Sequence, residues 1–257
     1  MKQRHSIQRV LTPRPRRLAL TACIAAVAFA LSARTCPADR ITFEGLSRGE
    51  VLTDQYAASH GVRFSAVNNH SGHPDKLAIF DSEDVTGGDP DLGYPWAGGN
   101  LAGEPLGNLF IIAEDDVDGD GDGLIDDPDD ESRGGVAIIE FDALITSFRF
   151  DSIDVDDGAG YSVDIYRDGG LLDTLTYDAL EQIDPTIDFG DHKANRMPWI
   201  TAETVGGAFD EVRINVAGSH GFDSIEFNRP EVPEPAALAT LTIGGAAALL
   251  RRRGRTA

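Results

Sequence analysis

The chain has 257 residues, and its 43 acidic side chains outnumber its 22 lysines and arginines, giving a formal net charge of −21 at pH 7. Seven of the basic residues precede Asp39 and four follow Leu250, so the stretch between them carries 11 minus 43, or −32. Such a charge argues against nucleic acid as a partner, and it predicts that calcium, or the salt of a saline habitat, screens the internal repulsion.

The first 38 residues have the pattern of a secretory signal peptide. Basic residues without any acidic neighbour occupy positions 2–17, and an uncharged apolar stretch follows over 18–31. Cleavage is expected after Ala38, with Ala33 as the alternative, because a small residue precedes each bond. A cut after Ala38 removes Cys23 and Cys36, so the mature body is expected to lack disulfides, thiol catalysis and thiolate metal sites.

Residues 39–229 are predicted to form one all-β domain. Strands are expected at residues 41–46, 62–67, 77–80, 109–113, 136–141, 145–150, 161–167, 171–177, 211–216 and 222–227. Alternation is clearest where Tyr161, Val163 and Ile165 share one face, and Gly169-Gly170 predicts the hairpin turn that follows. No sustained helical period interrupts these short strands, which favours an antiparallel β-sandwich of the jelly-roll type.

Short segments near both ends of this domain resemble carbohydrate-binding modules of the β-sandwich type. They are Ile41-Thr42-Phe43-Glu44-Gly45, Gln55-Tyr56 with Gly61-Val62-Arg63-Phe64, and Gly221-Phe222-Asp223-Ser224-Ile225-Glu226-Phe227. The resemblance implies that the first and last strands lie side by side and that Glu44 and Asp223, one from each, hold a structural calcium ion. The alternative is that both are ordinary outward-facing strand residues.

Two aromatic segments are candidates for ligand contact. Tyr94 and Trp96 flank a proline in a glycine-rich loop, and a second segment ends at Trp199. Because sugar rings stack on exposed aromatic faces, Tyr94 and Trp96 are predicted to contact a polysaccharide. The alternative is that Trp96 and Trp199 cover the ends of the core.

Catalytic constellations are poorly represented in the sequence. His70 and His73 are spaced so that two imidazoles could reach a metal, with Asp75 close by, but the surrounding Asn, Ser, Gly and Pro residues favour a solvated loop. Carboxylate pairs are so abundant that they single out no acid and base of a glycosidase. The sequence therefore predicts a non-catalytic polysaccharide-binding or structural module, with a secreted glycan hydrolase as the alternative.

Residues 114–134 are predicted to form an inserted calcium loop, because alternate aspartates supply the oxygen ligands that calcium requires. The predicted ligands are the carboxylates of Asp118, Asp120, Asp122, Asp126 and Asp129 and the backbone carbonyl of Leu124. Gly123 stands at the sharp turn, and Ile125 is expected to point inward. The loop resembles those of dockerins and thrombospondin type 3 repeats, although Asp129 stands where an EF-hand has glutamate. A disordered acidic segment is the alternative.

Residues 230–257 have the pattern of a sorting tail. A proline-rich motif precedes an apolar run over 236–250, predicted to be helical, and a basic cluster ends the chain: Val232, Pro233, Glu234 and Pro235, then Arg251, Arg252 and Arg253. At about 1.5 Å per residue the run spans about 22 Å, which is short for a permanent membrane span.

This tail resembles the PEP-CTERM sorting signal, which is also labelled the C-terminal domain of ice-binding proteins. The resemblance implies transient insertion in the inner membrane, cleavage by an exosortase, and release to the cell surface or extracellular matrix. A plain membrane anchor is the alternative, since the arginines hold the chain end on the cytoplasmic side in either case.

Overall fold

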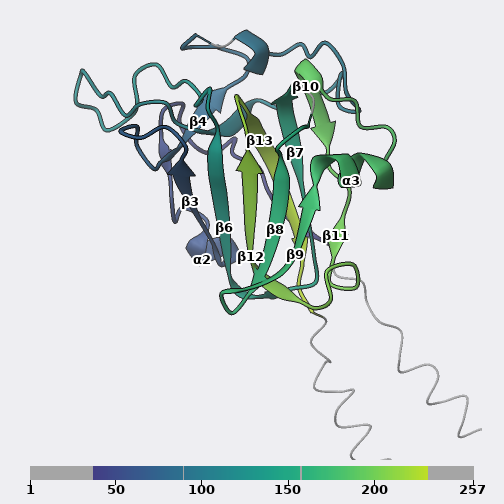
Figure 1. Cartoon of the computed structure of the whole chain (residues 1–257). Helices are drawn as coiled ribbons and strands as arrows, with labels where there is room; N and C mark the ends of the chain where they lie inside the picture. Colours follow the sequence, from purple (N-terminus) through teal and green to yellow (C-terminus); the bar gives the residue numbers. More distant parts are fainter. Residues whose placement is uncertain (1–36, 89, 157, 231–257) are drawn as a thin grey trace, which may run out of the picture. The chain divides into compact units, whose positions relative to one another are not determined.

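The computed structural model describes residues 37–88, 90–156 and 158–230, which form a sandwich of two antiparallel β-sheets (Figure 1). Sheet A contains β1 (Asp39–Ile41), β2 (Val51–Leu52), β4 (Leu77–Asp81), β5 (Asn108–Ile112), β7 (Ser147–Val155), β10 (Gly190–Arg196), β11 (Ile200–Thr201) and β13 (Gly221–Asn228). Sheet B contains β3 (Val62–Asn68), β6 (Gly135–Ile145), β8 (Ser162–Arg167), β9 (Gly170–Thr176) and β12 (Phe209–Val216). The described helices are α2 (Ala57–His60), α3 (Tyr177–Ile183) and the 3-10 turn η2 (Pro90–Leu92).

The strand order is that of a jelly roll. Sheet A has the order β10-β7-β13-β5-β4-β2, and sheet B has the order β3-β6-β12-β8-β9. From β5 to β13, leaving out the two-residue β11, each strand lies in the opposite sheet from the one before it, except that β8 and β9 form a hairpin within sheet B. β5 pairs with β13, the last strand of the domain. Two interlocked Greek keys have this connectivity. The predicted all-β sandwich is therefore confirmed.

Nine of the ten predicted strands overlap an observed strand over most of their length, whereas the first, predicted at 41–46, shares only Ile41 with β1. β1 stops at Ile41, because the chain turns at Phe43 and Leu46, where the N–H of Leu46 donates to the carbonyl of Phe43. β9 stops at Thr176, whose side-chain oxygen accepts the N–H of Ala179 and so begins α3 at Tyr177.

Three strands were missed by sequence reasoning. β2 and β11 contain only two residues each. β10 is longer but pairs only with β7 among the main strands, and its first half is Gly190-Asp191-His192-Lys193, which carries no apolar alternation. A polar edge strand gives no period-two signal.

The space between the sheets is filled by aromatic and aliphatic side chains. Phe110 of β5 and Phe222 of β13 are paired in register, and their rings stack with centroids 4.7 Å apart. Tyr177, the first residue of α3, is fully buried against the same cluster. Fully burying each such side chain contributes about 1.5–3 kcal/mol.

A second apolar cluster covers the outer face of sheet A. Leu109 and Ile111 of β5 point to this side, where they meet Leu92 and Trp96 from the long connection before β5 and Ile125 from the acidic insertion. As a result, β7 and β13 are buried at nearly every position, whereas β3 and β12 of sheet B alternate between buried and solvent-accessible residues. Sheet A is thus enclosed on both faces.

Among the described residues, no helix is long and apolar enough to cross a membrane. The apolar stretch 18–31 of the predicted signal peptide, the helix expected at 236–250 and the sorting motif all lie outside the described residues.

Candidate functional site

Trp96 is a buried core residue. Its side chain is 5% exposed, its ring lies edge-on to Tyr94 with centroids 5.9 Å apart, and its indole N–H donates to the carbonyl of Glu104 at 2.9 Å. The expectation that a loop displays Trp96 for stacking is therefore wrong. The loop is held down because Leu101 and Leu106 close over the same cluster. Tyr94 is half-buried at its margin.

The second tryptophan lines an open pocket of about 470 Å³ on the outer side of sheet A. The polar and aromatic part of the lining comprises Asn100, Glu104, Arg149, Asp184, Arg196 and Trp199. These residues come from the connection before β5, from β7, from the end of α3 and from the end of β10 and the segment that follows it. Sequence reasoning identified the aromatic segment ending at Trp199 but not the residues that fold around it.

Two arginines of this pocket are fixed by carboxylates of sheet A. Arg149 places its guanidinium carbon 4.5 Å from the centroid of the Trp199 ring while donating to Glu226 at 2.8 and 3.1 Å. Arg196 makes a bidentate pair with Asp151, at 2.8 and 2.9 Å. A bidentate charge-assisted pair holds the Arg196 guanidinium in one orientation. Arg149 donates twice to a single oxygen of Glu226 and stacks on Trp199, so both groups are positioned before any ligand arrives.

A third charged group of the pocket is the Asp184 carboxylate at the end of α3. The hydroxyl and the N–H of Thr186 donate to it at 2.7 and 3.0 Å, and these hydrogen bonds lower the pKa of Asp184. The pocket therefore presents an indole ring, two guanidinium groups and the carboxyl groups of Asp184 and Glu104.

Glu44 and Asp223 differ in burial. β1 does pair with β13, as the resemblance implies, but Glu44 lies beyond the end of β1, is exposed, and accepts the N–H of Asn108 at 3.1 Å. Asp223 lies in β13 but is buried, and Glu44 is exposed but lies outside β1, so neither is an outward-facing strand residue. One oxygen of Asp223 accepts the hydroxyl of Ser224 at 2.9 Å, and the other finds no hydrogen-bond partner among the described residues.

Burial raises the pKa of Asp223 to about 7, and the negative charge of Asp151, its cross-strand partner, adds to the effect. Hydrogen bonds from Ser224 oppose the shift without cancelling it, and the charge of Glu44 contributes in the same direction as Asp151. Asp151 itself has a pKa raised by burial, although Arg196 opposes this. Sheet A thus carries two coupled buried carboxyl groups.

In the acidic insertion, the structure brings together three of the five predicted carboxylates. Oxygen atoms of Asp118, Asp120 and Asp126 lie within 4.8 Å of one another. Asp118 organises the turn, because its carboxylate accepts the N–H groups of Gly121 and Gly123 at 2.7 and 3.0 Å. Together these residues could contribute three of the six to eight oxygen ligands that calcium takes.

The remaining predicted residues of this loop behave differently. Asp122 accepts the N–H of Leu124 at 2.9 Å, within the same turn. Asp129 is not part of the group, because its carboxylate accepts the N–H groups of Gly88 and Asp130 at 2.8 and 3.1 Å. The chain has already turned back by this point to form a bridge between Ala113 and Asp130. Asp129 is the twelfth residue of the predicted calcium loop. Among the described residues, no helix follows it directly to bring its carboxylate back toward Asp118, Asp120 and Asp126.

Ile125 points inward as predicted and is 5% exposed in the second apolar cluster. Its N–H donates to the carbonyl of Gly49 at 2.9 Å, at a point where a Cβ on Gly49 would overlap the Ile125 carbonyl. The base of the insertion is closed by the N–H of Glu114, which donates to the carbonyl of Asp129 at 3.0 Å. The segment is therefore an ordered loop anchored at its base and at Ile125.

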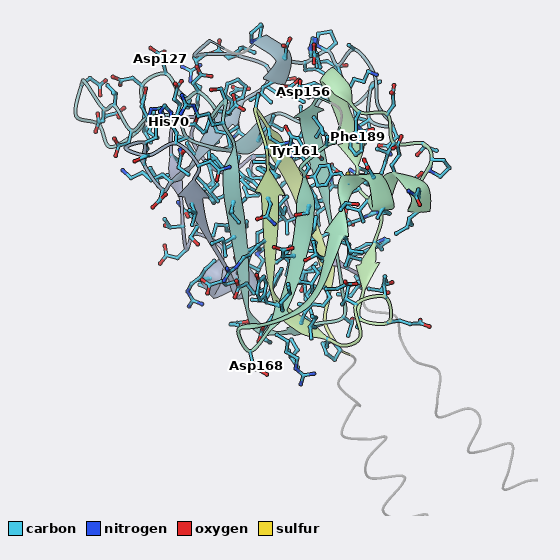
Figure 2. All side chains as sticks on the ribbon, in the orientation of Figure 1. His70, Asp127, Asp156, Tyr161, Asp168 and Phe189 are labelled. Carbon is cyan, nitrogen blue, oxygen red and sulfur yellow. The ribbon has the colours of Figure 1, made fainter. Side chains whose placement is uncertain are left out.

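A second group of candidate metal ligands lies at the same end of the sandwich. Figure 2 shows His70 and Asp127 toward one end of the sandwich and Asp168 of the β8-β9 hairpin at the other end. His70 and His73 meet the buried side chain of Glu131 there. Burial favours a raised pKa for Glu131, but the N–H of Arg133 and the hydrogen bond with His73 outweigh it, so the pKa is lowered.

Comparison with known proteins gives little further information. No family model matches the chain, and no curated protein sequence matches it. The K2 cleaved adhesin domain of Lys-gingipain is similar over 74% of this chain and 99% of that domain, at 12% identity and a TM-score of 0.39. The catalytic unit of a thermostable alpha-1,3-glucanase from Streptomyces thermodiastaticus is similar over 78% of this chain, at 11% identity and a TM-score of 0.28. The chain spans 28% of that unit, and likenesses this distant carry no functional information.

Buried Asp223 predicts a specific pH dependence of stability. Its pKa is about 7 in the folded state and 3.8 as an unperturbed group, so the folded state binds more protons between about pH 4 and 7. The free energy of unfolding should therefore fall as pH rises through this window, by up to about 1.4 kcal/mol per pH unit for one group. Asp223→Asn should remove this slope in urea titrations at stepped pH. Asp191→Asn, at an exposed position of β10, should retain it, and an unchanged slope in Asp223→Asn would contradict the assignment.

Proposed function

We propose that the domain is a non-catalytic module that binds polysaccharide in the pocket on the outer side of sheet A. The observation that carries the proposal is the Trp199 ring, which lines an open pocket of about 470 Å³ beside two fixed guanidinium groups. The C–H faces of a sugar ring pack on an indole, and its hydroxyl groups pair with arginine and carboxylate side chains. The ligand class is therefore a hydroxyl-rich glycan.

The fixed arginines support this proposal energetically. A long side chain that must be immobilised costs about 0.5–1.5 kcal/mol on binding. Arg149 and Arg196 are already held by Glu226 and Asp151, so a ligand meets them in their final orientation. Both signs of charge are present in the lining, which suits hydroxyl groups better than a strongly anionic ligand.

A secreted glycan hydrolase is the second candidate, because Glu104 and Asp184 line the same pocket. The lowered pKa of Asp184 suits a base or nucleophile, and a glycosidase also needs a carboxylic acid that stays protonated. Glu104 would have to supply that acid. Release of reducing sugar from a glycan panel, lost in Glu104→Gln, would favour the hydrolase over the binding module.

We also propose that calcium binds to the acidic insertion and stabilises it, and that the protein is exported and sorted through its tail. Asp118, Asp120 and Asp126 form the calcium-binding core of the loop, with Asp122 and the Leu124 carbonyl as neighbours in the same turn. Asp223, with one unpartnered buried oxygen beside exposed Glu44, is the candidate for a second cation. Export rests on the signal-peptide pattern and the proline-rich tail motif.

The first test concerns the pocket. Trp199→Ala should weaken binding to host exopolysaccharide by roughly tenfold or more, as for other central tryptophans of binding sites, without unfolding the domain. The matched control is Tyr166→Ala, which removes a ring at 4.4 Å from the Arg213 guanidinium on sheet B and does not line the pocket. Affinity electrophoresis in a gel containing the polysaccharide measures both. Equal retention of the two variants would contradict the proposal.

The second test concerns calcium. Calcium at 100 times its Kd should add about 2.7 kcal/mol to the free energy of unfolding. Asp120→Asn should abolish one equivalent of calcium uptake in titration calorimetry and the associated rise in Tm. Asp127→Asn, an exposed carboxylate of the same loop outside the group, should preserve both. Full calcium uptake by Asp120→Asn would exclude this loop as the site.

The third test concerns the tail. Because Val232-Pro233-Glu234-Pro235 precedes a short apolar run and three arginines, cleavage is expected near Pro235 in the native host. Mass spectrometry of the surface or secreted form should find a C-terminus in this region. Replacement of Pro233, Glu234 and Pro235 by alanine should leave the protein membrane-bound, and a mature wild-type peptide that ends at Ala257 would refute sorting by cleavage.

A further inference from the structure

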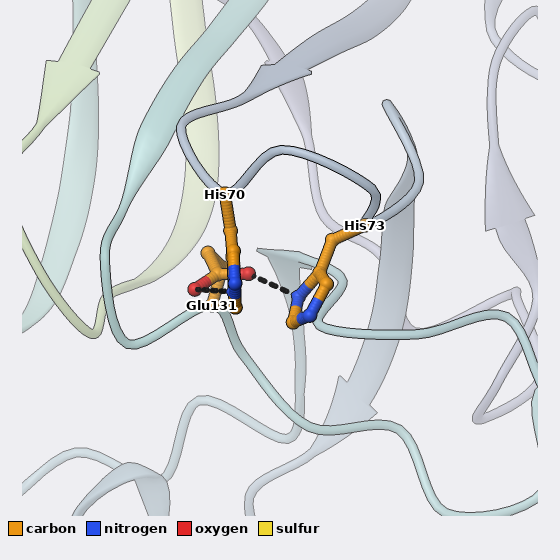
Figure 3. Close-up of side chains that lie close together, drawn as sticks. All are labelled: His70, His73 and Glu131. Carbon is orange, nitrogen blue, oxygen red and sulfur yellow. Dashed lines mark hydrogen bonds and ion pairs between the residues drawn. The ribbon is translucent and has the colours of Figure 1, made fainter.

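Two imidazoles and one buried carboxylate meet where the β3-β4 loop crosses the segment before β6 (Figure 3). Nδ1 of His73 lies 2.7 Å from one oxygen of Glu131, and Nδ1 of His70 lies 3.7 Å from the other. The candidate ligand atoms of all three residues lie within 4.8 Å of one another. The Glu131 side chain is fully buried, whereas the imidazoles are 31% and 25% exposed, so the cluster opens toward solvent on the histidine side.

The backbone around the cluster is fixed by hydrogen bonds within and between its two segments. Asn68, the last residue of β3, accepts the N–H of His70 at 2.7 Å and donates to the carbonyl of Ala113 at 3.1 Å. The N–H of His73 donates to the carbonyl of His70 at 3.1 Å, which closes the turn between the two histidines. Both imidazoles are thus presented on a loop that is already shaped.

The carboxylate is oriented from its own segment. The N–H of Arg133 donates to Glu131 at 3.0 Å. The neighbouring residues tie the two segments together, because the N–H of Asn69 donates to the carbonyl of Gly134 and its side chain donates to the carbonyl of Arg133, each at 3.1 Å. Partners of this kind orient a ligand before it binds an ion.

We propose that His70, His73 and Glu131 bind a divalent transition-metal ion, with Zn²⁺ as the best fit. Zinc binds histidine nitrogen and carboxylate oxygen at about 2.0–2.2 Å, which separates neighbouring ligand atoms of a tetrahedral site by about 3.4 Å. The observed separations of 2.7 and 3.7 Å lie on either side of this value. Two histidines and one carboxylate leave a fourth position for water or a ligand, in keeping with the half-exposed imidazoles.

A plain ion pair explains only half of this arrangement. It gives His73 a hydrogen bond to Glu131, but it leaves Nδ1 of His70 at 3.7 Å from the same carboxylate, within ion-pair distance and beyond hydrogen-bonding distance. The ring centroids of the two histidines are also only 3.6 Å apart, which is unfavourable if both rings are protonated. A shared cation accounts for both rings. Its ligand chemistry also differs from that of the acidic loop, because imidazole nitrogen selects zinc, copper or nickel and calcium takes oxygen.

The ion would join residues far apart in the chain. His73 and Glu131 are 58 positions apart, and Glu131 follows directly after the base of the acidic insertion. A metal at this point therefore fastens the insertion to the β3-β4 loop. This site is independent of the proposed glycan pocket, which lies on other residues.

Titration calorimetry with Zn²⁺ alone, on the full chain held in excess calcium, tests the site. Wild type should bind zinc with an affinity that His70→Ala and His73→Ala each lower by about tenfold or more. The control His60→Ala removes a half-exposed imidazole of α2 outside the cluster and should bind as wild type does. Thermal melts in the absence of zinc confirm that each variant is folded.

Substitution by cobalt gives a second readout. Co²⁺ in the wild-type chain should show the visible absorption of a nitrogen- and oxygen-ligated tetrahedral ion, and Glu131→Gln, if folded, should lose it. His70→Ala keeps the test informative if Glu131→Gln does not fold, because His70 is half-exposed. The absence of zinc uptake by wild type, or equal uptake by wild type and His70→Ala, would overturn the proposal.

Discussion

Two neighbouring interior strands of sheet A, β7 and β13, are buried on both faces, and they nevertheless carry acidic side chains. Asp151, Asp223 and Glu226 are all buried on these strands. A buried carboxylate is costly unless it is paired or protonated. Arg196 pairs with Asp151 and Arg149 with Glu226, while burial raises the pKa of Asp223 to about 7 and so favours its neutral form. The two arginines near Trp199 are therefore held in place by ion pairs with the buried carboxylates of sheet A.

Positively charged side chains are scarce over the whole domain, and most of them are paired. Of the 11 lysines and arginines between Asp39 and Leu250, nine form ion pairs with carboxylates: Arg40, Arg48, Lys76, Arg149, Arg167, Lys193, Arg196, Arg213 and Arg229. Most of these pairs are partly exposed and individually contribute about 0–1 kcal/mol. The 43 acidic residues far exceed the available side-chain cations. A metal ion brings two positive charges to one point, which no lysine or arginine can do.

Strands and turns could be predicted from the sequence, whereas contacts between residues far apart in the chain could not. Val163 and Ile165 alternate with wet residues because one face of sheet B is open to solvent, so their strand could be predicted. The Asp118 turn is likewise local. Trp96 and Trp199 look alike in sequence, since each follows a proline, and only the apolar cover over Trp96 distinguishes them. Glu131 belongs to no sequence motif, because its partners lie in a loop about sixty residues earlier.

The anchoring of the acidic insertion limits what a cation there has to do. Backbone hydrogen bonds join Glu114 to Asp129 at the base of the insertion and Val117 to Asp126 further along it. Ile125 packs in the second apolar cluster and so fixes one side of the insertion to the domain. These contacts leave only the short turn that begins at Asp118 without an anchor. The entropy cost of ordering a loop grows with its length, so ordering this turn costs little. In that turn backbone N–H groups already draw the carboxylates together. The fold supplies most of the ordering, and an ion need only overcome the mutual repulsion of the aspartates.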